Sequence, residues 1–382
     1  MSEIVIVGGG VVGLSIAYEL AGQGASVRVL EKSNFGQEAS WAGAGMLPPG
    51  NLECARTPES VLRSFSYSIW PEWSERLQEE TGIDIGYRNC GGLTICLSGI
   101  EDSLKDEIAW WHREGVIVEQ LSRKELFQLE SQLSEKISSV FRLPQMSQVR
   151  NPRYLKALVA GCHARGVELV SGELVTRFHI RNGRVVSVQG SNETYSAEHV
   201  CLASGAWSRA LLEPINLNLD VHPVRGQIVL LSTKPGLFSH IVEVGPRYLV
   251  PRPDGRVLIG STEESVGFEK RNTAEAIAEL IAFGTSICPA LKDATFERAW
   301  SGLRPGTASR IPFLSRVPEI ENLTIAAGHF RSGLQMSPAT AVLMKQLILN
   351  EPARIPIEPF SLLRDSSASE GLSINPVPNT FQ

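Results

Sequence analysis

Short apolar runs alternate with amphipathic stretches from the start of the chain. Residues 4–7 are apolar and β-branched, which is typical of a buried parallel strand, and residues 14–20 follow a helical pattern. Residues 27–30 form a second apolar run that ends at Glu31. Between the first strand and the helix stands GGGVVG (residues 8–13), which fits G-x-G-x-x-G. The order predicts a βαβ unit.

The glycines of this turn have separate physical roles. Gly8 allows a tight turn, Gly10 lets the backbone approach a pyrophosphate, and Gly13 lets the helix pack against the strand. The helix N-terminus offers free N–H groups and a positive dipole end to phosphate. Glu31 stands where its carboxylate can accept hydrogen bonds from ribose hydroxyls. The unit predicts a dinucleotide site, against the alternative of a glycine-rich turn in an ordinary α/β protein, and it does not separate NAD from FAD.

Two further segments predict close approach of the backbone to a ligand. Residues 36–47 are dominated by small residues, and they include Trp41, Met46 and Leu47, which are unusual in a flexible linker. We expect a loop that lies against the cofactor. Residues 200–203 form another buried strand that ends in small residues at 204–206, followed by Trp207.

The region between residues 58 and 203 predicts a mixture of helices and strands. Asn151 and Pro152 suit the start of a helix, with the asparagine side chain as its cap. Asn182-Gly183 is a strong hairpin signal. We expect a core helix over 58–81, a strand pair over 87–97 around Gly91-Gly92, helices over 101–114 and 151–165, strands at 169–170 and 174–176, and a hairpin over 178–188.

From residue 221 the pattern favours antiparallel strands, at 222–230, 248–251 and 256–260, with a turn at Asp254-Gly255. A helix is expected over 274–286, a ligand-facing loop over 299–306, a parallel strand over 323–327 and a last helix over 338–349. The fold class is therefore α/β, with an antiparallel domain inserted into a Rossmann-like domain. We expect a cofactor domain from residues 1–80, 148–215 and 320–363, a substrate domain from 81–147 and 216–319, and a disordered tail over 364–382.

Composition narrows the function. The 382 residues are 43% hydrophobic and 20% charged, which suits a soluble protein of two domains, and the formal net charge of −5 argues against nucleic acid or anionic lipid as partner. No run of eighteen apolar residues predicts a membrane span, and the first strand begins too early for a cleaved leader, so we expect a cytoplasmic protein. Its cysteines lack metal-site spacing and are expected to be reduced thiols: Cys54, Cys90, Cys96, Cys162, Cys201 and Cys288.

Several motifs together resemble the D-amino-acid oxidase family of FAD proteins, and most closely its glycine oxidases of thiamine biosynthesis. Beside the glycine fingerprint they are PVRGQ (223–227), WSGLRPGT (300–307) and AAGHFRSG (326–333). The resemblance covers nearly the whole chain to about residue 360. It implies FAD in place of NAD, held in a domain of the glutathione-reductase type. No cysteine stands near Arg304, where related sarcosine oxidases attach FAD, so we expect non-covalent FAD.

The resemblance also implies site residues. Arg304 would bind the substrate carboxylate, with Tyr248 nearby and Arg331 at the mouth of the pocket. His329 would pack on the flavin, and Gln335 replaces a usually apolar residue beside it. The residues implied to contact the cofactor are Gly8, Gly10, Val11, Val12, Gly13, Glu31, Lys32, Ala39, Ser40, Gly45, Met46, Leu47, Val175, Ser204, Gly205, Trp207, His329, Phe330, Arg331, Ser332, Gly333, Leu334 and Gln335.

Physical chemistry supports Arg304 separately, because a guanidinium matches a carboxylate with two parallel hydrogen bonds. The implied reaction is oxidation of glycine to iminoglycine, with O₂ as acceptor and H₂O₂ as product. Iminoglycine would then serve thiazole synthesis or hydrolyse to glyoxylate and ammonia. Flavin chemistry needs no general base beyond loss of the amine proton, so His329 is expected not to be catalytic. A homo-oligomer is also implied.

Three alternatives stay open. The substrate could be sarcosine, a D-amino acid or D-proline, because a few pocket side chains decide it. The acceptor could be a quinone or a carrier, which would make the protein a dehydrogenase. In the third alternative, a bound flavin only stabilises a scaffold.

Overall fold

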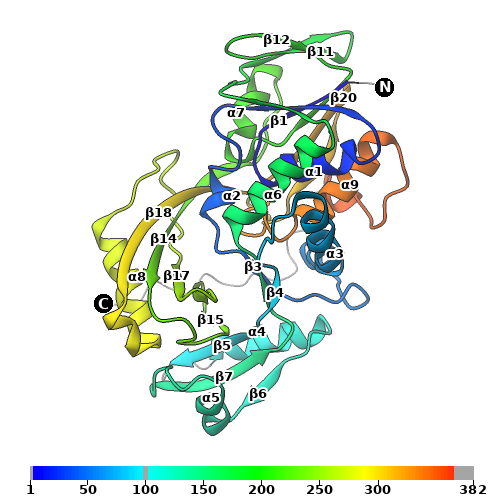
Figure 1. Cartoon of the computed structure of the whole chain (residues 1–382). Helices are drawn as coiled ribbons and strands as arrows, with labels where there is room; N and C mark the ends of the chain where they lie inside the picture. Colours follow the sequence, from blue (N-terminus) through cyan, green and yellow to red (C-terminus); the bar gives the residue numbers. More distant parts are fainter. Residues whose placement is uncertain (1–2, 98–101, 365–382) are drawn as a thin grey trace.

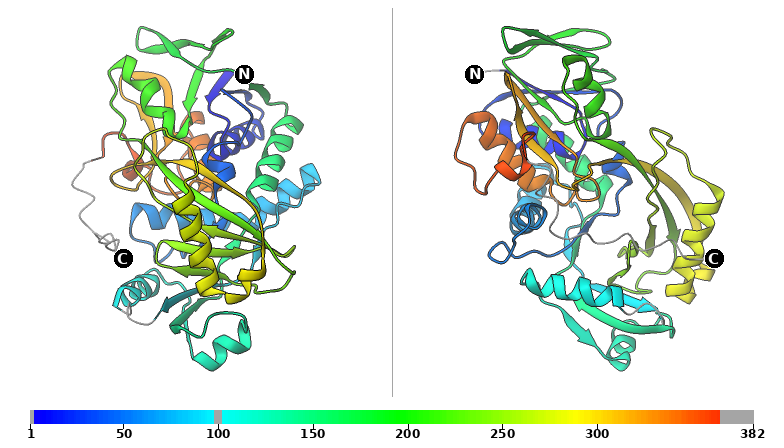
Figure 2. Two further views of the ribbon diagram at one scale, coloured as in Figure 1. Left: turned by 90° about the vertical axis from the view of Figure 1, so that its left-hand side faces the viewer. Right: turned by 180° about the vertical axis from the view of Figure 1, so that it is seen from behind.

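Two large sheets organise the computed structural model, which describes residues 3–97 and 102–364 (Figure 1). Residues 365–382 of the predicted tail, and Glu101 of the helix predicted over 101–114, lie outside the described residues. In Figure 1 one sheet occupies the upper part of the molecule and the other curves through the lower part, and Figure 2 shows the same two lobes from the side and from behind. The predicted α/β fold is confirmed.

The upper sheet has the order β19-β20-β13-β1-β2-β9, and its pairs are parallel except for β19 with β20. Val7 stands opposite Leu202 and Leu30, so three strands end together at the edge that carries the glycine turn. The strands are β1 (Glu3–Val7), β2 (Ser26–Glu31), β9 (Glu168–Ser171), β13 (His199–Leu202), β19 (Phe313–Val317) and β20 (Ile320–Ala327).

Side chains of β1 point alternately to the two faces of the sheet, and each face belongs to a different hydrophobic core. Ile4 and Ile6 pack among helices, whereas Val5 and Val7 pack toward a three-stranded antiparallel sheet on the other face. The helices are α1 (Val11–Ala21), α3 (Pro58–Thr81), α6 (Asn151–Ala164) and α9 (Ser337–Leu349), and the small sheet holds β10 (Arg177–Arg181), β11 (Arg184–Gln189) and β12 (Thr194–Ser196). The predicted hairpin at Asn182-Gly183 is β10–β11.

The second sheet has the order β18-β14-β17-β16-β15-β5-β7-β6. Helices α8 (Ala274–Ile287) and α5 (Arg123–Leu129) pack on one face, and α4 (Asp102–Arg113) packs on the other. Its strands are β5 (Gly92–Leu97), β6 (Glu119–Leu121), β7 (Ile137–Leu143), β14 (His222–Ser232), β15 (Ile241–Val244), β16 (Arg247–Pro251), β17 (Arg256–Gly260) and β18 (Thr295–Gly306).

Several local predictions were wrong. The segments around Gly91-Gly92 do not pair with each other, because β5 pairs with β7 and β15 while β4 (Arg88–Asn89) pairs with β8 (Ser147–Gln148). Residues 174–176 form no strand, and the loop expected over 299–306 is part of β18. The segment 36–47 contains a helical turn, α2 (Ala39–Ala42), and β3 (Met46–Leu47).

The domain boundaries stay a prediction. One observation bears on them, because β19 falls within 216–319, the range assigned to the substrate domain, yet pairs with β20 of the parallel sheet. The parts of the chain that the structure describes contain no helix with the length and apolar character needed to cross a membrane.

Candidate FAD and substrate site

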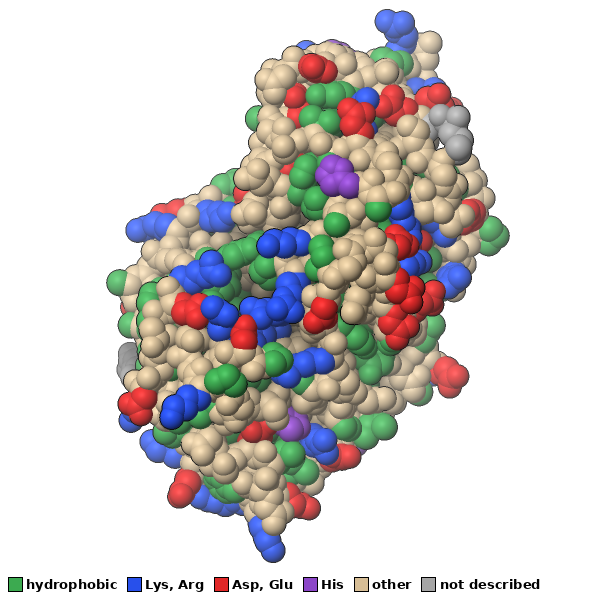
Figure 3. All heavy atoms as spheres, in the orientation of Figure 1, with side chains coloured by type: hydrophobic (Ala, Val, Ile, Leu, Met, Phe, Trp, Pro, Cys, Tyr) green, Lys and Arg blue, Asp and Glu red, His purple; other side chains and the backbone are tan. Residues whose placement is uncertain are grey.

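A cavity of about 490 Å³ is lined by residues of both sheets. The parallel sheet contributes the ends of its strands, from Val7 to Ala327, and the antiparallel sheet contributes one face of β14, β16 and β18. Ligands of α/β sheets bind outside the carboxyl ends of the strands, which is where this cavity lies. On the face shown in Figure 3, Lys and Arg side chains gather around a hollow in the middle of the molecule.

Most of the predicted site residues line this cavity. They are Gly8, Gly10, Val11, Val12, Glu31, Lys32, Ala39, Ser40, Gly45, Met46, Val175, Ser204, Gly205, Trp207, Tyr248, Arg304, His329, Phe330, Arg331, Gly333, Leu334 and Gln335. Gly13, Leu47 and Ser332 are not among the lining residues. Gly13 packs instead against Gly8, since a Cβ on Gly13 would stand 2.0 Å from the Gly8 carbonyl oxygen, and Leu47 is fully buried in the helical core.

At one end of the cavity the backbone is shaped for a dinucleotide. Gly8 has φ of +112°, and a Cβ there would stand 2.5 Å from the carbonyl oxygen of Ala203, so glycine is required twice over. The turn leads directly into α1, whose first residue, Val11, donates its N–H to Ser40 Oγ at 2.9 Å. A helix N-terminus that faces a cavity is a phosphate site.

The Glu31 carboxylate is held in place from both sides. Gly9 N donates to Glu31 Oε2 at 2.8 Å, and the backbone and hydroxyl of Ser33 donate to Oε1 at 3.0 and 3.2 Å. Each carboxylate oxygen can accept more than one hydrogen bond, so Glu31 keeps capacity for ribose hydroxyls. The neighbouring Lys32 lies over the ring of Trp207, 3.3 Å from its centroid.

The small-residue segment is fastened by side chains from distant elements. Asn151 was expected to cap α6, but Arg150 holds the cap position and the Asn151 amide donates to the Ser40 carbonyl at 2.9 Å. Arg252 donates to the Ala44 carbonyl at 2.7 Å, and Trp300 donates to that of Ala42 at 3.1 Å. This segment therefore forms a fixed wall of the cavity.

Arg304 lies at the other end of the cavity, on the face of β18 that Gly226 of β14 shares. Arg304 Nη1 donates to the Thr262 carbonyl at 3.0 Å, and Nη2 donates to Ser261 Oγ at 2.7 Å. Burial lowers the pKa of Arg304, but an arginine remains cationic at neutral pH. Among the described residues no carboxylate forms an ion pair with Arg304, so a partly buried cation faces a cavity and suits an anionic ligand.

The two other predicted substrate contacts differ in setting. Tyr248 is buried, and its ring lies over Gly260, where a Cβ would stand 2.5 Å from the phenol oxygen. Arg331 is more exposed, and it donates from Nη2 to the Pro246 carbonyl at 2.9 Å and lies 3.7 Å from a Glu263 carboxylate oxygen. Arg331 is thus already paired, unlike Arg304.

His329 and Gln335 are both engaged by the protein. Burial lowers the pKa of His329 to about 4, and its Nε2 lies 3.0 Å from Thr340 Oγ1. His329 is therefore neutral at pH 7 and packed as a wall residue. Gln335 donates its amide to the Pro48 carbonyl at 2.9 Å, while its own backbone carbonyl accepts from Ser66 and Trp70.

Sequence reasoning missed part of the lining. Asn151, Gly226 and Ser261 line the cavity, together with Glu173 and Leu174. Gly36 and Ala206 also line it, and both belong to the small-residue segments that were expected to approach a ligand. Gly226 belongs to the PVRGQ motif, but nothing in the sequence explains a glycine there. The structure supplies the reason, because the Arg304 guanidinium lies directly against it. Among the described residues no cysteine lines the cavity, and none of the six cysteines is in a disulfide. The described residues hold no cluster of side chains suited to a metal ion.

Comparisons with known proteins agree with this geometry. The family model described as "FAD dependent oxidoreductase" (DAO) matches residues 3–347. The chain is 33% identical to a glycine oxidase of Pseudomonas putida, over 94% of this chain and 98% of that protein. It is 34% identical to a bifunctional protein ThiO/ThiG of Synechocystis, over 94% of this chain and 53% of that protein. The solved glycine oxidase of Geobacillus kaustophilus superposes with a TM-score of 0.90 at 31% identity, over 96% of this chain and all of that one.

Proposed function

The chain belongs to the DAO family of FAD-dependent oxidoreductases, and from this premise we propose that it is an oxidase of glycine. Arg304 carries the proposal, because it is a cation that has no carboxylate partner within residues 3–97 and 102–364 and faces the same cavity as the dinucleotide turn. A curated relative and a solved relative that each cover nearly the whole chain, from Pseudomonas putida and Geobacillus kaustophilus, are named glycine oxidases.

The residues of the cavity fit FAD. The N-terminus of α1 and the Gly8–Gly10 backbone would hold the pyrophosphate, Glu31 would bind the ADP ribose, and residues 39–47 with 329–335 would enclose the flavin. All six cysteines lie outside the lining that the described residues form, which supports non-covalent binding. Bound FAD would supply the two-electron oxidation of the substrate Cα–N bond.

The remaining tasks fall to the protein. Arg304 binds the carboxylate and so fixes which side of the α-carbon faces the flavin ring. This is a positioning effect, and a displacement of the substrate by about 1 Å can lower the rate about 100-fold. Tyr248 and Gly226 shape the space around that carboxylate. His329 takes no proton, because burial lowers its pKa to about 4, which makes it a weak base, and its Nε2 is hydrogen-bonded to Thr340. The substrate loses its ammonium proton to solvent before oxidation.

The products would be iminoglycine and, after hydrolysis, glyoxylate and ammonia, with O₂ as the acceptor and H₂O₂ as its product. The relative that joins ThiO to ThiG supports supply of the imine to thiazole synthesis for thiamine. A cytoplasmic homo-oligomer is part of the proposal. Sarcosine, D-amino acids and D-proline remain rival substrates, and a quinone or carrier remains a rival acceptor.

The test is anaerobic reduction of the purified, FAD-loaded protein by glycine, sarcosine, D-alanine and D-proline. Fast loss of flavin absorbance with glycine, followed by recovery in air with one H₂O₂ per flavin, is the expected result. Loss of flavin absorbance without recovery in air would indicate a dehydrogenase and not an oxidase. If none of the four compounds reduced the flavin, oxidation of these amino acids would be rejected, and the alternative that the flavin only stabilises a scaffold would be favoured.

A further inference from the structure

Arg304 is held by a short segment that leaves the sheet after β17. Its two acceptors are the Ser261 hydroxyl and the Thr262 carbonyl, at 2.7 and 3.0 Å. Both belong to neighbouring residues, so the position of one short stretch of backbone sets the direction of the guanidinium. Whatever fixes residues 261–262 therefore fixes the proposed carboxylate site.

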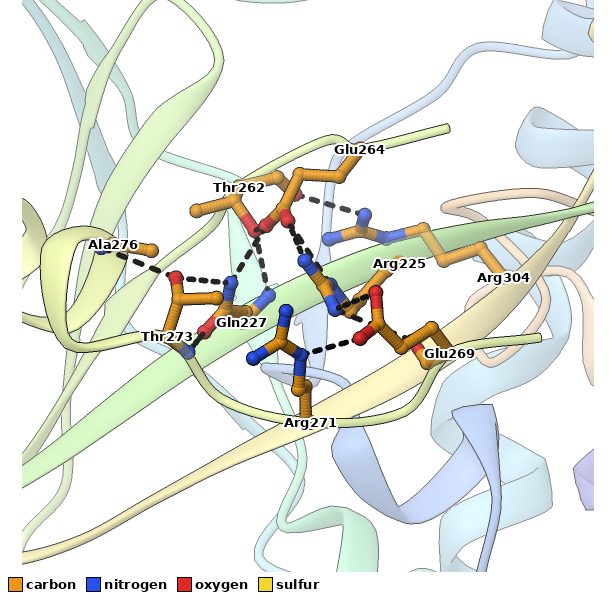
Figure 4. Close-up of polar contacts among 9 residues, drawn as sticks. All are labelled: Arg225, Gln227, Thr262, Glu264, Glu269, Arg271, Thr273, Ala276 and Arg304. Atoms are coloured by element: carbon orange, nitrogen blue, oxygen red, sulfur yellow. Dashed lines mark hydrogen bonds and ion pairs between the residues drawn. The ribbon is translucent and has the colours of Figure 1, made fainter. Parts of the chain in front are cut away.

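The opposite face of β14 carries a buried polar network that reaches the same segment. Arg225 and Gln227 are 3% and 0% exposed, and their side chains point away from the face that Gly226 shares with Arg304. The Thr262 hydroxyl accepts from Gln227 N at 2.9 Å and donates to Glu264 Oε1 at 2.5 Å. Thr262 thus offers its carbonyl to one face and its hydroxyl to the other, as Figure 4 shows.

Glu264 is the centre of this network. Its Oε1 accepts from Thr262 and from the Gln227 amide, the latter at 2.8 Å, and its Oε2 accepts from Nε of Arg225 at 3.0 Å and from Nη2. The backbones of Arg225 and Glu264 also exchange two hydrogen bonds of 2.9 Å. One carboxylate therefore ties the segment after β17 to the middle of the sheet.

We infer that Glu264 is a positioning residue for substrate binding, which acts through Thr262 to hold the guanidinium of Arg304 in place for the substrate carboxylate. This inference rests on the proposed function, since it concerns the residue that would bind the carboxylate. Among the described residues Glu264 forms no hydrogen bond or ion pair with Arg304, so its structural effect is transmitted by the backbone of residues 261–262, beside the longer-range attraction between its charge and the guanidinium. Burial would raise the pKa of Glu264, but hydrogen bonds from Thr262, Arg225 and Gln227 together hold it below its usual value.

Glu264→Gln is the sharpest variant, because it keeps the shape of the side chain while it removes the negative charge that pairs with Arg225 and changes the hydrogen-bond pattern. All partners of the carboxylate are donors, whereas an amide offers one acceptor and one donor, so one side must lose its bonds. We expect the KM for glycine to rise about tenfold, with kcat changed less than threefold and FAD content unchanged. Glu80→Gln is the matched control, since Glu80 also accepts two bonds from one arginine, Arg165, away from the cavity.

A ligand that needs no turnover separates this inference from the proposed reaction. Glycolate has the carboxylate without the amine, and its Kd is measured from the change in the flavin spectrum. In Glu264→Gln we expect glycolate to bind about tenfold more weakly, in proportion to the KM of glycine. Thr262→Val, which removes the hydroxyl, provides a second variant with the same expected direction.

Two results would overturn the inference. One is a folded, FAD-loaded Glu264→Gln protein, or Thr262→Val protein should the first not fold, whose glycolate Kd stays within twofold of the wild type. The other is an equal rise of the Kd in Glu80→Gln, which would mean that any lost ion pair loosens the site. Failure of glycine to reduce the wild-type flavin would reject the proposed reaction and leave the glycolate comparison standing.

Discussion

Replacing Gly226 by alanine tests whether the surface beneath Arg304 sets the reaction rate. A Cβ at this position would stand 2.1 Å from Nη2 and 2.3 Å from Cζ of Arg304. Ordinary van der Waals contact begins at 3.4 Å, so the guanidinium must move by 3.4 − 2.1 = 1.3 Å. The backbone has little freedom to move instead, because β14 is hydrogen-bonded to β17 on one side and to β18 on the other.

The expected cost follows from this displacement. A misplacement of about 1 Å at a reacting centre costs about 100-fold in rate, which corresponds to about 2.7 kcal/mol of transition-state stabilisation. We therefore expect kcat/KM of Gly226→Ala for glycine to fall about 100-fold. FAD content should remain that of the wild type, because the contact is at the end of the cavity away from the dinucleotide turn.

The assay is oxygen consumption over a range of glycine concentrations, with FAD content and melting temperature recorded for each protein. Arg304→Ala and the double variant complete a cycle. If Gly226 matters only by making room for Arg304, then alanine at 226 costs nothing once Arg304 is gone. A Gly226→Ala enzyme with kcat/KM within threefold of the wild type would refute the reasoning, as would full additivity in the cycle.

Three further predictions follow from the same geometry. Arg304→Lys should lose about 2–5 kcal/mol of substrate binding, measured as kcat/KM, while it keeps its FAD, because lysine cannot replace the two-fold contact with a carboxylate. Glu31→Gln should weaken FAD binding about tenfold, in a titration of the apoprotein, since the amide NH2 would face the backbone N–H of either Gly9 or Ser33, and neither of these donors can accept from it. The folded pKa of His329, about 4, lies below the unfolded value of 6.5, so stability should fall as the pH drops from 6.5 toward 4. The free energies of unfolding from urea titrations at pH 7 and pH 5 should differ by about 1–2 kcal/mol more in the wild type than in His329→Gln.

Local signals in the sequence were enough for the elements whose neighbours are close in the chain. The helix predicted over 58–81 has those bounds in the structure, with Thr57 as its side-chain cap and Gly82 in the left-handed conformation at its end. The βαβ unit at the start of the chain and the hairpin at Asn182-Gly183 follow the same rule. Each of these elements is specified within about thirty residues.

The wrong predictions concern segments whose residue types are explained by contacts with residues far away in the sequence. Gly302, Pro305 and Gly306 are poor strand residues, so the segment around Arg304 read as a loop. In the structure it belongs to the edge strand of the sheet, where prolines are tolerated, and Pro305 stands opposite Pro223 of β14. Gly302 is small because a Cβ there would stand 2.6 Å from the Cβ of Ala42, in the wall beside the cavity. Glycine and proline argued against a strand in this segment, but they are residues that fit a strand beside the cavity.

The same reason accounts for the part of the site that sequence did not predict. Glu264 stands forty positions before Arg304, in a segment with no helical or strand periodicity, and only the register of β14 with β18 brings the two onto opposite sides of one strand. The sequence assigned no role to Arg225 and Gln227 beyond membership of a family motif. Their common partner is Glu264, which the backbone pairing of Arg225 with Glu264 brings beside them. Most of the residues that line the cavity were predictable from their chemistry. Those that hold them were not, since a positioning role is a property of sheet register, and one sequence does not encode register in any short pattern.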